Sequence, residues 1–282
     1  MEQFDLIIIG AGSGNSILTD DFADWNVAIV ERDVFGGTCL NRGCIPSKMF
    51  IYPASIVETV RTADALGVEA HVDNVRWPEI VERVFGRIDP IAAGGEEYRR
   101  SLDNVTVFSE DARFIGHKQV QVGDQVITAD TIVLAAGARP RIPDIAGLAD
   151  VRFHTSATIM RVPTPPPRLA ILGGGFIACE MGHVFQAAGS QVTIINRSQQ
   201  LLRNHDDEIS ERFTQVFGER FDLRCGETPT QIRHEGDEII IEFPTGDPIV
   251  ADELLVATGR IANGEQLGVA ETGVEIDDSG YV

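Results

Sequence analysis

Two cysteines separated by four residues, Cys39 and Cys44, are the side chains in this sequence best suited to redox chemistry. In a reducing compartment such cysteines are usually free thiols, and a zinc site would need further cysteine or histidine ligands nearby, which this stretch lacks. Residues five apart on a regular helix lie about 8.6 Å apart between Cα atoms, whereas a disulfide tolerates at most ~7 Å. The two sulfurs can therefore bond only if the helix is interrupted between them, and Gly43 gives the backbone freedom for that.

A disulfide that closes so small and strained a loop is easily reduced, which suits catalysis better than stability. Pro46 is expected in the disturbed first turn of the helix that follows, where proline is tolerated. The other two cysteines, Cys179 in an apolar helical segment and Cys225 near a predicted strand, are interpreted as inert.

Two glycine-rich turns could hold the pyrophosphate groups of dinucleotides. An apolar strand at residues 6–9 runs into Gly-Ala-Gly-Ser-Gly-Asn at 10–15, and a second at 169–172 runs into Gly-Gly-Gly-Phe-Ile-Ala at 173–178. Glycines allow the backbone close to the phosphates, and the helix predicted after each turn adds the positive end of its dipole. Asn15 and Ala178 stand where a third glycine is usual. Alanine is an accepted variant, while Asn15 is expected to loosen the helix–strand contact or to make a polar contact.

The residues at the end of each second strand discriminate between nucleotides. Glu31 ends the strand at 27–30 and can accept hydrogen bonds from both hydroxyls of an unphosphorylated adenosine ribose; the alternative is a solvated carboxylate. The second copy has no acid there but Asn196, Arg197 and then Arg203. Two arginines around a 2′-phosphate favour NADPH over NADH, and the alternative is a solvated basic turn.

The same order of predicted elements, which must position these residues, occurs twice along the chain. Each copy has a strand, a glycine turn, a helix and a second strand, and the segments 129–137 and 251–259 each read as a strand stopped by glycine at the carboxyl edge of a sheet. Polar alternating stretches near 105–128 and 222–250 are predicted as antiparallel meanders, and residues 53–102 as helical with breaks near 77–78 and 94–95. Three consecutive prolines at 165–167 predict a stiff linker between the halves.

The predicted fold is therefore α/β, with two Rossmann-like doubly wound domains that carry antiparallel β-meander insertions. We place the first domain at 1–147, the second at 148–262, and the start of a return segment to the first domain at 263–282. At ~150 residues per domain, 282 residues suit two domains. The chain ends without a third layer, and we expect it to be a fragment.

The charge balance excludes several classes of function. Against 43 acidic side chains there are 23 basic ones, a formal net charge of −20. Such a surface repels phosphate backbones and anionic lipids, so we expect no nucleic-acid or membrane role. No apolar run approaches the ~20 residues of a membrane span, the acidic start is unlike a secretory signal, and four cysteines are too few for a disulfide-stapled scaffold. We therefore expect a cytoplasmic protein.

The two glycine turns, the stretch Cys-Leu-Asn-Arg-Gly-Cys-Ile-Pro-Ser-Lys at 39–48 and Ala-Thr-Gly-Arg at 257–260 together resemble the pyridine nucleotide–disulfide oxidoreductases. The resemblance covers the whole chain. It implies a redox disulfide between Cys39 and Cys44, with Lys48 near flavin N5 and paired with Glu180. For FAD it implies a first set of residues: Gly10, Gly12, Ser13, Gly14, Glu31, Gly37, Thr38, Ala112 and Gly137. For NADPH it implies a second set: Gly173, Gly175, Phe176 as the gate of the nicotinamide pocket, Ile177, Arg197, Arg203, Gly259 and Arg260.

The resemblance also implies a relay from NADPH through FAD to the disulfide. Cys44 would be the sulfur nearer the flavin, Cys39 would attack a small-molecule disulfide such as that of mycothione, and Cys44 would resolve the mixed disulfide. The family takes its catalytic base from a His–Glu pair in a C-terminal dimerisation domain of a homodimer. None of the six histidines here lies in such a motif, so the chain is expected to lack that base.

Two other readings stay open. A dihydrolipoamide dehydrogenase-like enzyme fits the cysteine motif nearly as well, although NAD-dependent enzymes usually carry an acid where Asn196 stands. A non-catalytic flavin or nucleotide module that senses redox state is the alternative from another class. No metal site is expected.

Overall fold

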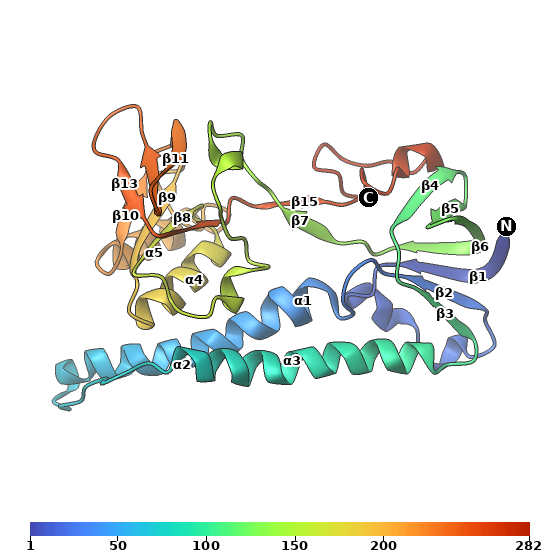
Figure 1. Ribbon diagram of the computed structural model, residues 1–282, viewed down its shortest axis with the longest axis horizontal. Helices are drawn as coiled ribbons and strands as arrows, with labels where there is room; N and C mark the ends of the chain where they lie inside the picture. Colours follow the sequence, from blue (N-terminus) through green and yellow to red (C-terminus); the bar gives the residue numbers. More distant parts are fainter. The chain divides into compact units, whose positions relative to one another are not determined.

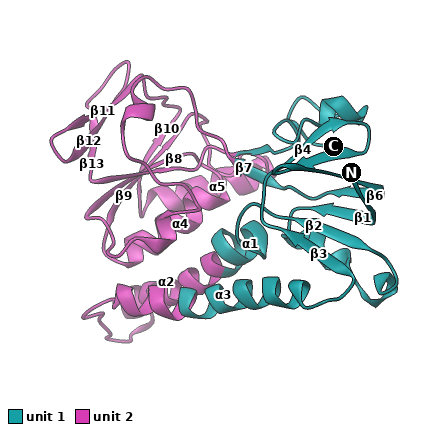
Figure 2. Cartoon of the chain, turned by 45° about the vertical axis from the view of Figure 1, so that its right-hand side comes forward, with its two compact units in different colours: residues 1–45, 85–139, 260–282 teal, residues 46–84, 140–259 magenta.

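The computed structural model describes residues 1–282, which divide into two compact units coloured in Figure 2. Unit 1 comprises residues 1–45, 85–139 and 260–282, and unit 2 comprises 46–84 and 140–259. This division differs from the predicted domain limits of 147/148 and 262/263. After β6 the chain passes from unit 1 to unit 2 at 139/140, and it re-enters unit 1 at Arg260. Residues 46–84, predicted as part of the first domain, group with unit 2. The proline-rich segment at 162–167, predicted as a linker between the halves, lies inside unit 2.

Unit 1 is built on a six-stranded sheet in the order β3-β2-β1-β6-β5-β4 (Figure 1). Strands β1, β2, β3 and β6 run parallel to one another, and β6 pairs with β1 over residues 127–134. The other edge is antiparallel: β5 pairs with residues 125–128 of β6 and with β4. The predicted meander is therefore confirmed from residue 112 onward, but Val105–Phe108 belongs to the parallel part. The strands are β1 (Glu2–Ile9), β2 (Val27–Val30), β3 (Val105–Phe108), β4 (Ala112–Gly116), β5 (Gln119–Val122) and β6 (Gln125–Leu134).

The apolar run of β1 forms a central strand because both of its faces are covered. Side chains alternate across a sheet, so Ile7 and Ile9 pack in one core cluster, while Leu6 and Ile8 pack in another on the opposite face. Phe4, at the start of the strand, belongs to the cluster of Ile7 and Ile9. All five are at most 3% exposed. A continuous apolar run is the expected pattern for a strand buried on both faces.

The helical region between β2 and β3 begins earlier than predicted, and its longest interruption, at 67–76, ends just before the predicted break at 77–78. It contains α1 (Gly37–Arg42), α2 (Cys44–Thr62), a short 3₁₀ turn (Ala63–Leu66) and α3 (Trp77–Arg100). Pro78 stands in the first turn of α3, where proline is tolerated. Residues 67–76 are not helical, and the predicted break at 94–95 is absent. Two glycines cost a helix about 1 kcal/mol each, but most helical stability comes from packing, and α3 buries a face that includes Val84, Phe85, Ile88 and Ala92.

Unit 2 contains a four-stranded parallel sheet in the order β10-β9-β8-β14 and a separate three-stranded antiparallel sheet, β11-β12-β13. The predicted meander is again confirmed only after its first strand, because β10 pairs in parallel with β9. The elements are two 3₁₀ turns (Leu148–Asp150 and Ile159–Arg161), β8 (Arg168–Leu172), α4 (Phe176–Ala187), β9 (Gln191–Asn196), α5 (Asp207–Gly218), β10 (Asp222–Cys225), β11 (Gln231–Glu235), β12 (Glu238–Glu242), β13 (Ile249–Ala251) and β14 (Glu253–Val256).

The two units share one strand plan, and the predicted α/β class with two Rossmann-like sheets is confirmed. In unit 1 the single strand β6 serves both the antiparallel part and the parallel sheet, where it pairs with β1. In unit 2 the corresponding segment is interrupted at Asp252 and forms two strands. The first, β13, pairs with β12, and the second, β14, pairs with β8. Asp252 accepts hydrogen bonds from the backbone and guanidinium of Arg168. The remaining strands, β7 (Ala138–Pro140) and β15 (Arg260–Ala262), form a short two-stranded sheet, and a 3₁₀ turn (Val269–Thr272) follows β15.

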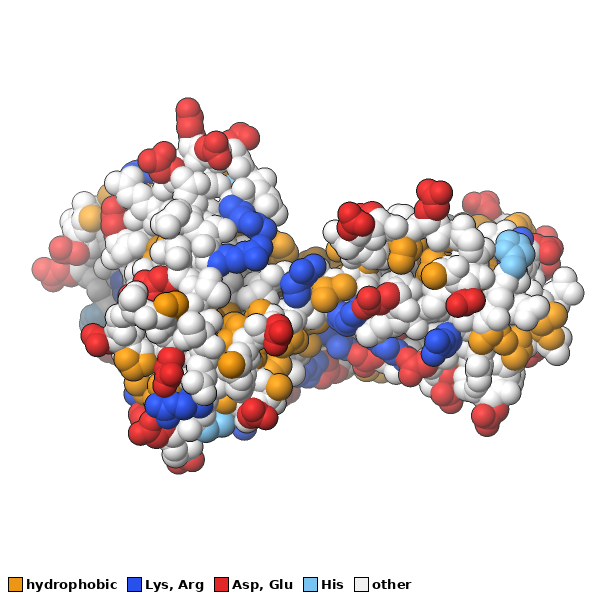
Figure 3. Space-filling model, turned by 90° about the horizontal axis from the view of Figure 1, so that it is seen from above, with side chains coloured by type: hydrophobic (Ala, Val, Ile, Leu, Met, Phe, Trp, Pro, Cys, Tyr) orange, Lys and Arg blue, Asp and Glu red, His pale blue; other side chains and the backbone are white.

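The surface carries the acidic excess expected from the composition. Figure 3 shows acidic side chains, in red, spread over both units on the face in view. None of the helices combines the length and the apolar character needed to cross a membrane.

Candidate nucleotide and dithiol site

The first glycine-rich turn lies at the carboxyl edge of the unit 1 sheet, where β1 is flanked by β2 and β6. The backbone of Gly10 donates to the carbonyl of Val30, and that of Ala135 donates to the carbonyl of Ile9. Gly10 has a φ of +107°, and a Cβ on it would lie 2.3 Å from the carbonyl oxygen of Ala135. Only glycine fits this position, because any side chain would clash with the backbone of the neighbouring strand.

The second turn in unit 2 repeats this geometry almost atom for atom. Gly173 donates to the carbonyl of Ile195 and has a φ of +122°, and its Cβ would lie 2.2 Å from the carbonyl oxygen of Ala257. The helix α4 begins directly afterwards at Phe176, whose side chain is 64% exposed. Gly175 has open space around it, and Ile177 is half-buried. This copy has the strand–turn–helix form that was predicted.

The first turn lacks the predicted α-helix. Two short 3₁₀ turns, Ser13–Ile17 and Asp20–Phe22, follow Gly12 instead. Arg99 on α3 donates to the carbonyls of Asn15 and Leu18, groups that an α-helix would use internally. Asn15 therefore does not pack a helix against the strand; its backbone N–H bonds to Gly12, and its side-chain oxygen is buried without a hydrogen-bond partner.

Glu31 is tied to the turn that it was predicted to serve. Its two carboxylate oxygens accept the backbone N–H of Ala11 at 2.8 Å and that of Asp33 at 2.9 Å. A carboxylate has about four lone-pair sites, so two or more stay available to ribose hydroxyls. The sugar-binding role of Glu31 stays a prediction.

Five further residues predicted to meet FAD also lie in unit 1. A Cβ on Gly37, whose φ is +58°, would lie 2.7 Å from the Cα of Gly12, so the start of α1 touches the glycine-rich turn. Thr38 follows on α1. Gly137 has a φ of +66° with open space beside it, and half-buried Ala112 begins β4. Gly14 faces the side chain of Ala135, with no room for a Cβ.

The predicted interruption between the two cysteines is confirmed. Helix α1 ends at Arg42, Gly43 takes a non-helical conformation with φ −144° and ψ −117°, and α2 begins at Cys44. A Cβ on Gly43 would lie 2.9 Å from the carbonyl oxygen of Thr38, so this break also favours glycine. Pro46 is the third residue of α2, in the first turn as expected.

Cys39 is half-buried and Cys44 is exposed. Their side chains are joined by a hydrogen bond, which is the largest cause that raises the pKa of Cys39; burial raises it further. The two sulfurs are therefore neighbours that flank the helix break at Gly43. Burial also raises the pKa of the Cys179 thiol to about 12 and raises that of Cys225, in line with their expected inertness.

Lys48 and Glu180 form the ion pair that was predicted, although 132 positions separate them in the sequence. Lys48 projects from α2, one turn after Cys44, and its side chain is 64% exposed; that of Glu180, on the first turns of α4, is 24% exposed. Their proposed place beside a flavin stays a prediction.

Asn196 is not a free group at the strand end. Its side chain is 7% exposed, packs beneath Gly174, and donates to the carbonyls of Ser198 and Gln200. The backbone of Leu202 donates to Gly174, which fastens this loop to the glycine-rich turn. The same loop carries Arg197 and Arg203, both with exposed side chains.

Arg260, which the family resemblance implies as an NADPH ligand, lies in unit 1. Its guanidinium donates to the hydroxyl of Thr38 at 3.3 Å and to the carbonyl of Ala138. Burial is the largest cause that lowers its pKa. Gly259 precedes it with a φ of +121° and open space at the Cβ position. Binding of NADPH by these two residues stays a prediction.

Two residues that support the site were missed by the sequence. Arg99 caps the 3₁₀ turn after Gly12, and Asn263 donates to the carbonyls of Ala136 and Gly137 at the end of β6. Arg99 lies in a polar stretch of helix with no motif around it. Asn263 follows Arg260 by three residues, and its proximity to that motif is the only signal in the sequence.

Fold and site together define a protein with two dinucleotide-type turns and a dithiol beside the first of them. The family model of the pyridine nucleotide-disulphide oxidoreductases matches residues 4–282, and the chain belongs to this family.

Three curated relatives illustrate the range of the family. Over 286 residues the chain is 45% identical to mycothione reductase of Mycobacterium tuberculosis H37Rv (99% of this chain, 62% of that protein). It is 33% identical over 288 residues to glutathione reductase of Burkholderia cepacia (99% and 62%) and 34% identical over 291 residues to dihydrolipoyl dehydrogenase of Chlamydia trachomatis serovar D (100% and 62%). The chain thus spans 62% of the length of these relatives.

A solved structure supports the fold. The Cu(II) complex of the HOCl-induced flavoprotein disulfide reductase RclA from Escherichia coli superposes with a TM-score of 0.86 at 24% sequence identity. The match covers 99% of this chain and 62% of that one.

Proposed function

We propose that unit 1 binds FAD, that unit 2 binds NADPH, and that the protein reduces a low-molecular-weight disulfide through Cys39 and Cys44. The observation that carries the proposal is the contact between the two thiols, on a helix break whose N-terminal side touches the first glycine-rich turn. The similarity to mycothione reductase makes mycothione disulfide the first substrate to test. We propose further that the protein works in the cytoplasm as a homodimer.

The residues present fit a dinucleotide at the first turn. Close contacts of Gly10 and Gly14 with Ala135, and of Gly37 with Gly12, leave no space for side chains where the turn must approach a pyrophosphate. The side-chain oxygen of Asn15, buried without a hydrogen-bond partner, lies in the 3₁₀ turn that follows. Bound FAD would supply the two-electron carrier between NADPH and the dithiol.

The dithiol can perform the exchange with its own atoms. The Cys39 thiolate attacks one sulfur of the substrate disulfide, and the first thiol leaves with a proton. Cys44 then attacks the Cys39 sulfur of the mixed disulfide, the second thiol leaves, and the pair is oxidised to a disulfide by two electrons. The pKa of Cys39 is raised, so a base must take its proton before the attack.

The experiment that tests this function is an anaerobic titration of the FAD-loaded protein with NADPH. Two coupled redox centres take up four electrons per chain, two for the flavin and two for the disulfide. An uptake of two electrons, with both cysteines still oxidised, would leave the flavin acting alone as in a redox sensor. Substrate turnover with mycothione disulfide, glutathione disulfide and lipoamide then ranks the three candidate substrates.

The choice between NADPH and NADH depends on the loop after β9. Asn196 is buried and its side chain donates to two carbonyls of the loop, those of Ser198 and Gln200. Arg197 and Arg203, in the same loop, have exposed side chains. A dihydrolipoamide dehydrogenase-like enzyme that uses NAD would instead need an acid at this strand end to bind the ribose hydroxyls.

Removal of either arginine should weaken NADPH binding selectively. A charge-assisted hydrogen bond to phosphate is worth ~1.5 kcal/mol or more, so Arg197→Ala or Arg203→Ala should raise the Kd for NADPH about tenfold. The Kd for NADH should stay within twofold, because NADH lacks the 2′-phosphate. Calorimetric titration measures both constants, and Arg212→Ala, an exposed arginine on α5, is the matched control. A wild-type preference for NADH would overturn the assignment of the cofactor.

A further inference from the structure

A row of polar contacts joins α2, which begins with Cys44, to α4, which begins at the second glycine-rich turn. Lys48 pairs with Glu180, Ser55 contacts the His183 Nε2 at 3.4 Å, and Arg61 donates to the carbonyls of Gln186 and Ala187. The residue numbers of the contacting pairs increase along both helices, so the two helices run in the same direction along the contact. Residues 48, 55 and 58 recur at helical spacing and share one face of α2.

Arg220 is the centre of this row. It lies just after α5, and its Nη2 is within hydrogen-bond distance of three groups: the Glu58 carboxylate at 3.0 Å, the Gln186 side-chain oxygen at 3.1 Å and the His183 Nδ1 at 3.3 Å. Gln186 returns a hydrogen bond to the carbonyl of Arg220. The side chains of Arg220 and Glu58 are 28% and 27% exposed, so the ion pair is partly shielded from water.

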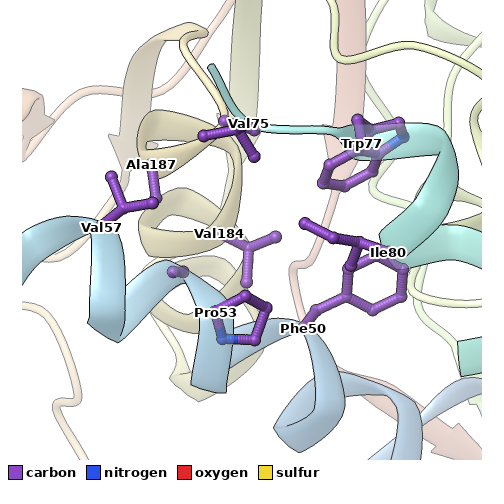
Figure 4. Close-up of a pocket in the computed structure, with 10 residues that line it drawn as sticks. Phe50, Pro53, Val57, Val75, Trp77, Ile80, Val184 and Ala187 are labelled. Carbon is purple, nitrogen blue, oxygen red and sulfur yellow. The ribbon is translucent and has the colours of Figure 1, made fainter. Parts of the chain in front are cut away.

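The neighbouring side of the same helices is apolar. Figure 4 shows Pro53 and Val57 of α2 facing Val184 and Ala187 of α4 around a small pocket. Apolar contact resists separation of two helices but allows them to slide, whereas directed hydrogen bonds set one register. The guanidinium of Arg220 provides several donors in a fixed plane and is suited to hold that register.

We propose that Arg220, acting through Glu58 and His183, is a positioning residue that sets the register of α2 against α4 and thereby the place of Lys48. Glu58 lies ten residues after Lys48, or about 15 Å along α2, which stays one continuous helix through Pro53, so a slide of α2 at Glu58 also moves Lys48. Displacements of about 1 Å can cost a reaction 100-fold in rate. The inference rests on the proposed function only in linking Lys48 to electron transfer.

The position of Lys48 can be measured without nucleotide or substrate. The test is the rate at which an amine-reactive acetylating reagent modifies Lys48, followed by mass spectrometry of the folded protein. Loss of the register separates Lys48 from Glu180, so Arg220→Ala should speed labelling of Lys48 about fivefold. Arg212→Ala, the control on α5, should leave the rate unchanged. Arg220→Lys, which keeps the charge but not the planar set of donors, should fall between wild type and Arg220→Ala.

A second readout connects the register to the reaction. In the FAD-loaded protein, Arg220→Ala should slow flavin reduction by NADPH about tenfold or more in stopped flow while the Kd for NADPH changes less than threefold. Unchanged labelling of Lys48 in Arg220→Ala overturns the proposal. Faster labelling with an unchanged rate of flavin reduction also overturns it, because Arg220 would then be only a structural residue.

A second variant, with a side chain of the same shape as the wild-type one, keeps the proposal testable if Arg220→Ala does not fold properly. If Arg220→Ala melts well below wild type, Glu58→Gln decides, because it keeps a hydrogen-bond acceptor of equal size and removes only the charge. Glu58→Gln should speed Lys48 labelling about twofold, and a wild-type rate counts against the proposal. If wild-type protein shows no flavin reduction by NADPH, the proposed function fails, while the labelling result still decides whether Arg220 sets the register of α2.

Discussion

Replacement of Cys44 by alanine should reduce the NADPH uptake of the FAD-loaded protein from four electrons per chain to two. Without Cys44 no disulfide can form with Cys39, so only the flavin accepts electrons. Disulfide turnover should fall by roughly 10³-fold or more, because loss of one member of a catalytic pair disables the unit. The uptake is measured by anaerobic titration and the turnover by release of thiol.

The same variant should make Cys39 more reactive. The hydrogen bond with Cys44 is the largest cause that raises the pKa of Cys39, so its loss lowers that pKa toward its ordinary value. At a pH below the pKa the thiolate fraction then rises, and alkylation of Cys39 by iodoacetamide becomes faster. A pH profile of the alkylation rate, read by mass spectrometry, should be displaced to lower pH in Cys44→Ala.

Cys225→Ser is the matched control, since Cys225 is a half-buried free thiol at the end of β10. It should keep the four-electron uptake and the alkylation profile of Cys39. An uptake of four electrons in Cys44→Ala would contradict the pairing, because some other pair of thiols would then have to supply the second centre.

Replacement of Gly10 by alanine should abolish retention of FAD. The new Cβ would lie 2.3 Å from the carbonyl oxygen of Ala135, at a φ of +107° that alanine rarely adopts. Overpacking and backbone strain together should lower the free energy of unfolding by about 2–5 kcal/mol and displace the turn from the edge of β6. Flavin retention is measured by absorbance after gel filtration, and stability by urea unfolding.

Gly94→Ala is the control for this substitution. Gly94 lies on an exposed turn of α3 with open space at the Cβ position, so alanine should stabilise the helix by up to ~1 kcal/mol and leave flavin retention unchanged. Full flavin retention in Gly10→Ala would show that the first turn does not form the proposed pyrophosphate site. Loss of NADPH binding by Gly173→Ala, with flavin retained, would confirm the separate roles of the two turns.

The structure corrects the sequence where distant residues compete with local preference. The glycine turn at 10–15 predicted an α-helix, but Arg99, 84 positions from Asn15, binds the carbonyls that such a helix would use. The two glycines at 94–95 predicted a break, but burial of Ile88 and Ala92 keeps α3 intact. In each case a contact from another part of the chain outweighed the preference of the segment.

By itself the sequence determined the features that depend on neighbours along the chain. Apolar runs predicted the central strands, glycine spacing predicted the two turns, and the distance between the two cysteines required a break between them if they are to bond. These follow from steric limits and periodicity within a few residues.

Only the tertiary structure decided which distant side chains meet. It brought Arg260 to Thr38 across 222 positions and Arg220 to Glu58 across 162, and it buried Asn196 beneath Gly174. Such contacts depend on how sheets and helices pack as whole bodies, and no pattern within one segment encodes the partner. Lys48 and Glu180 were paired in advance through family resemblance alone, because each, read locally, is a surface charge.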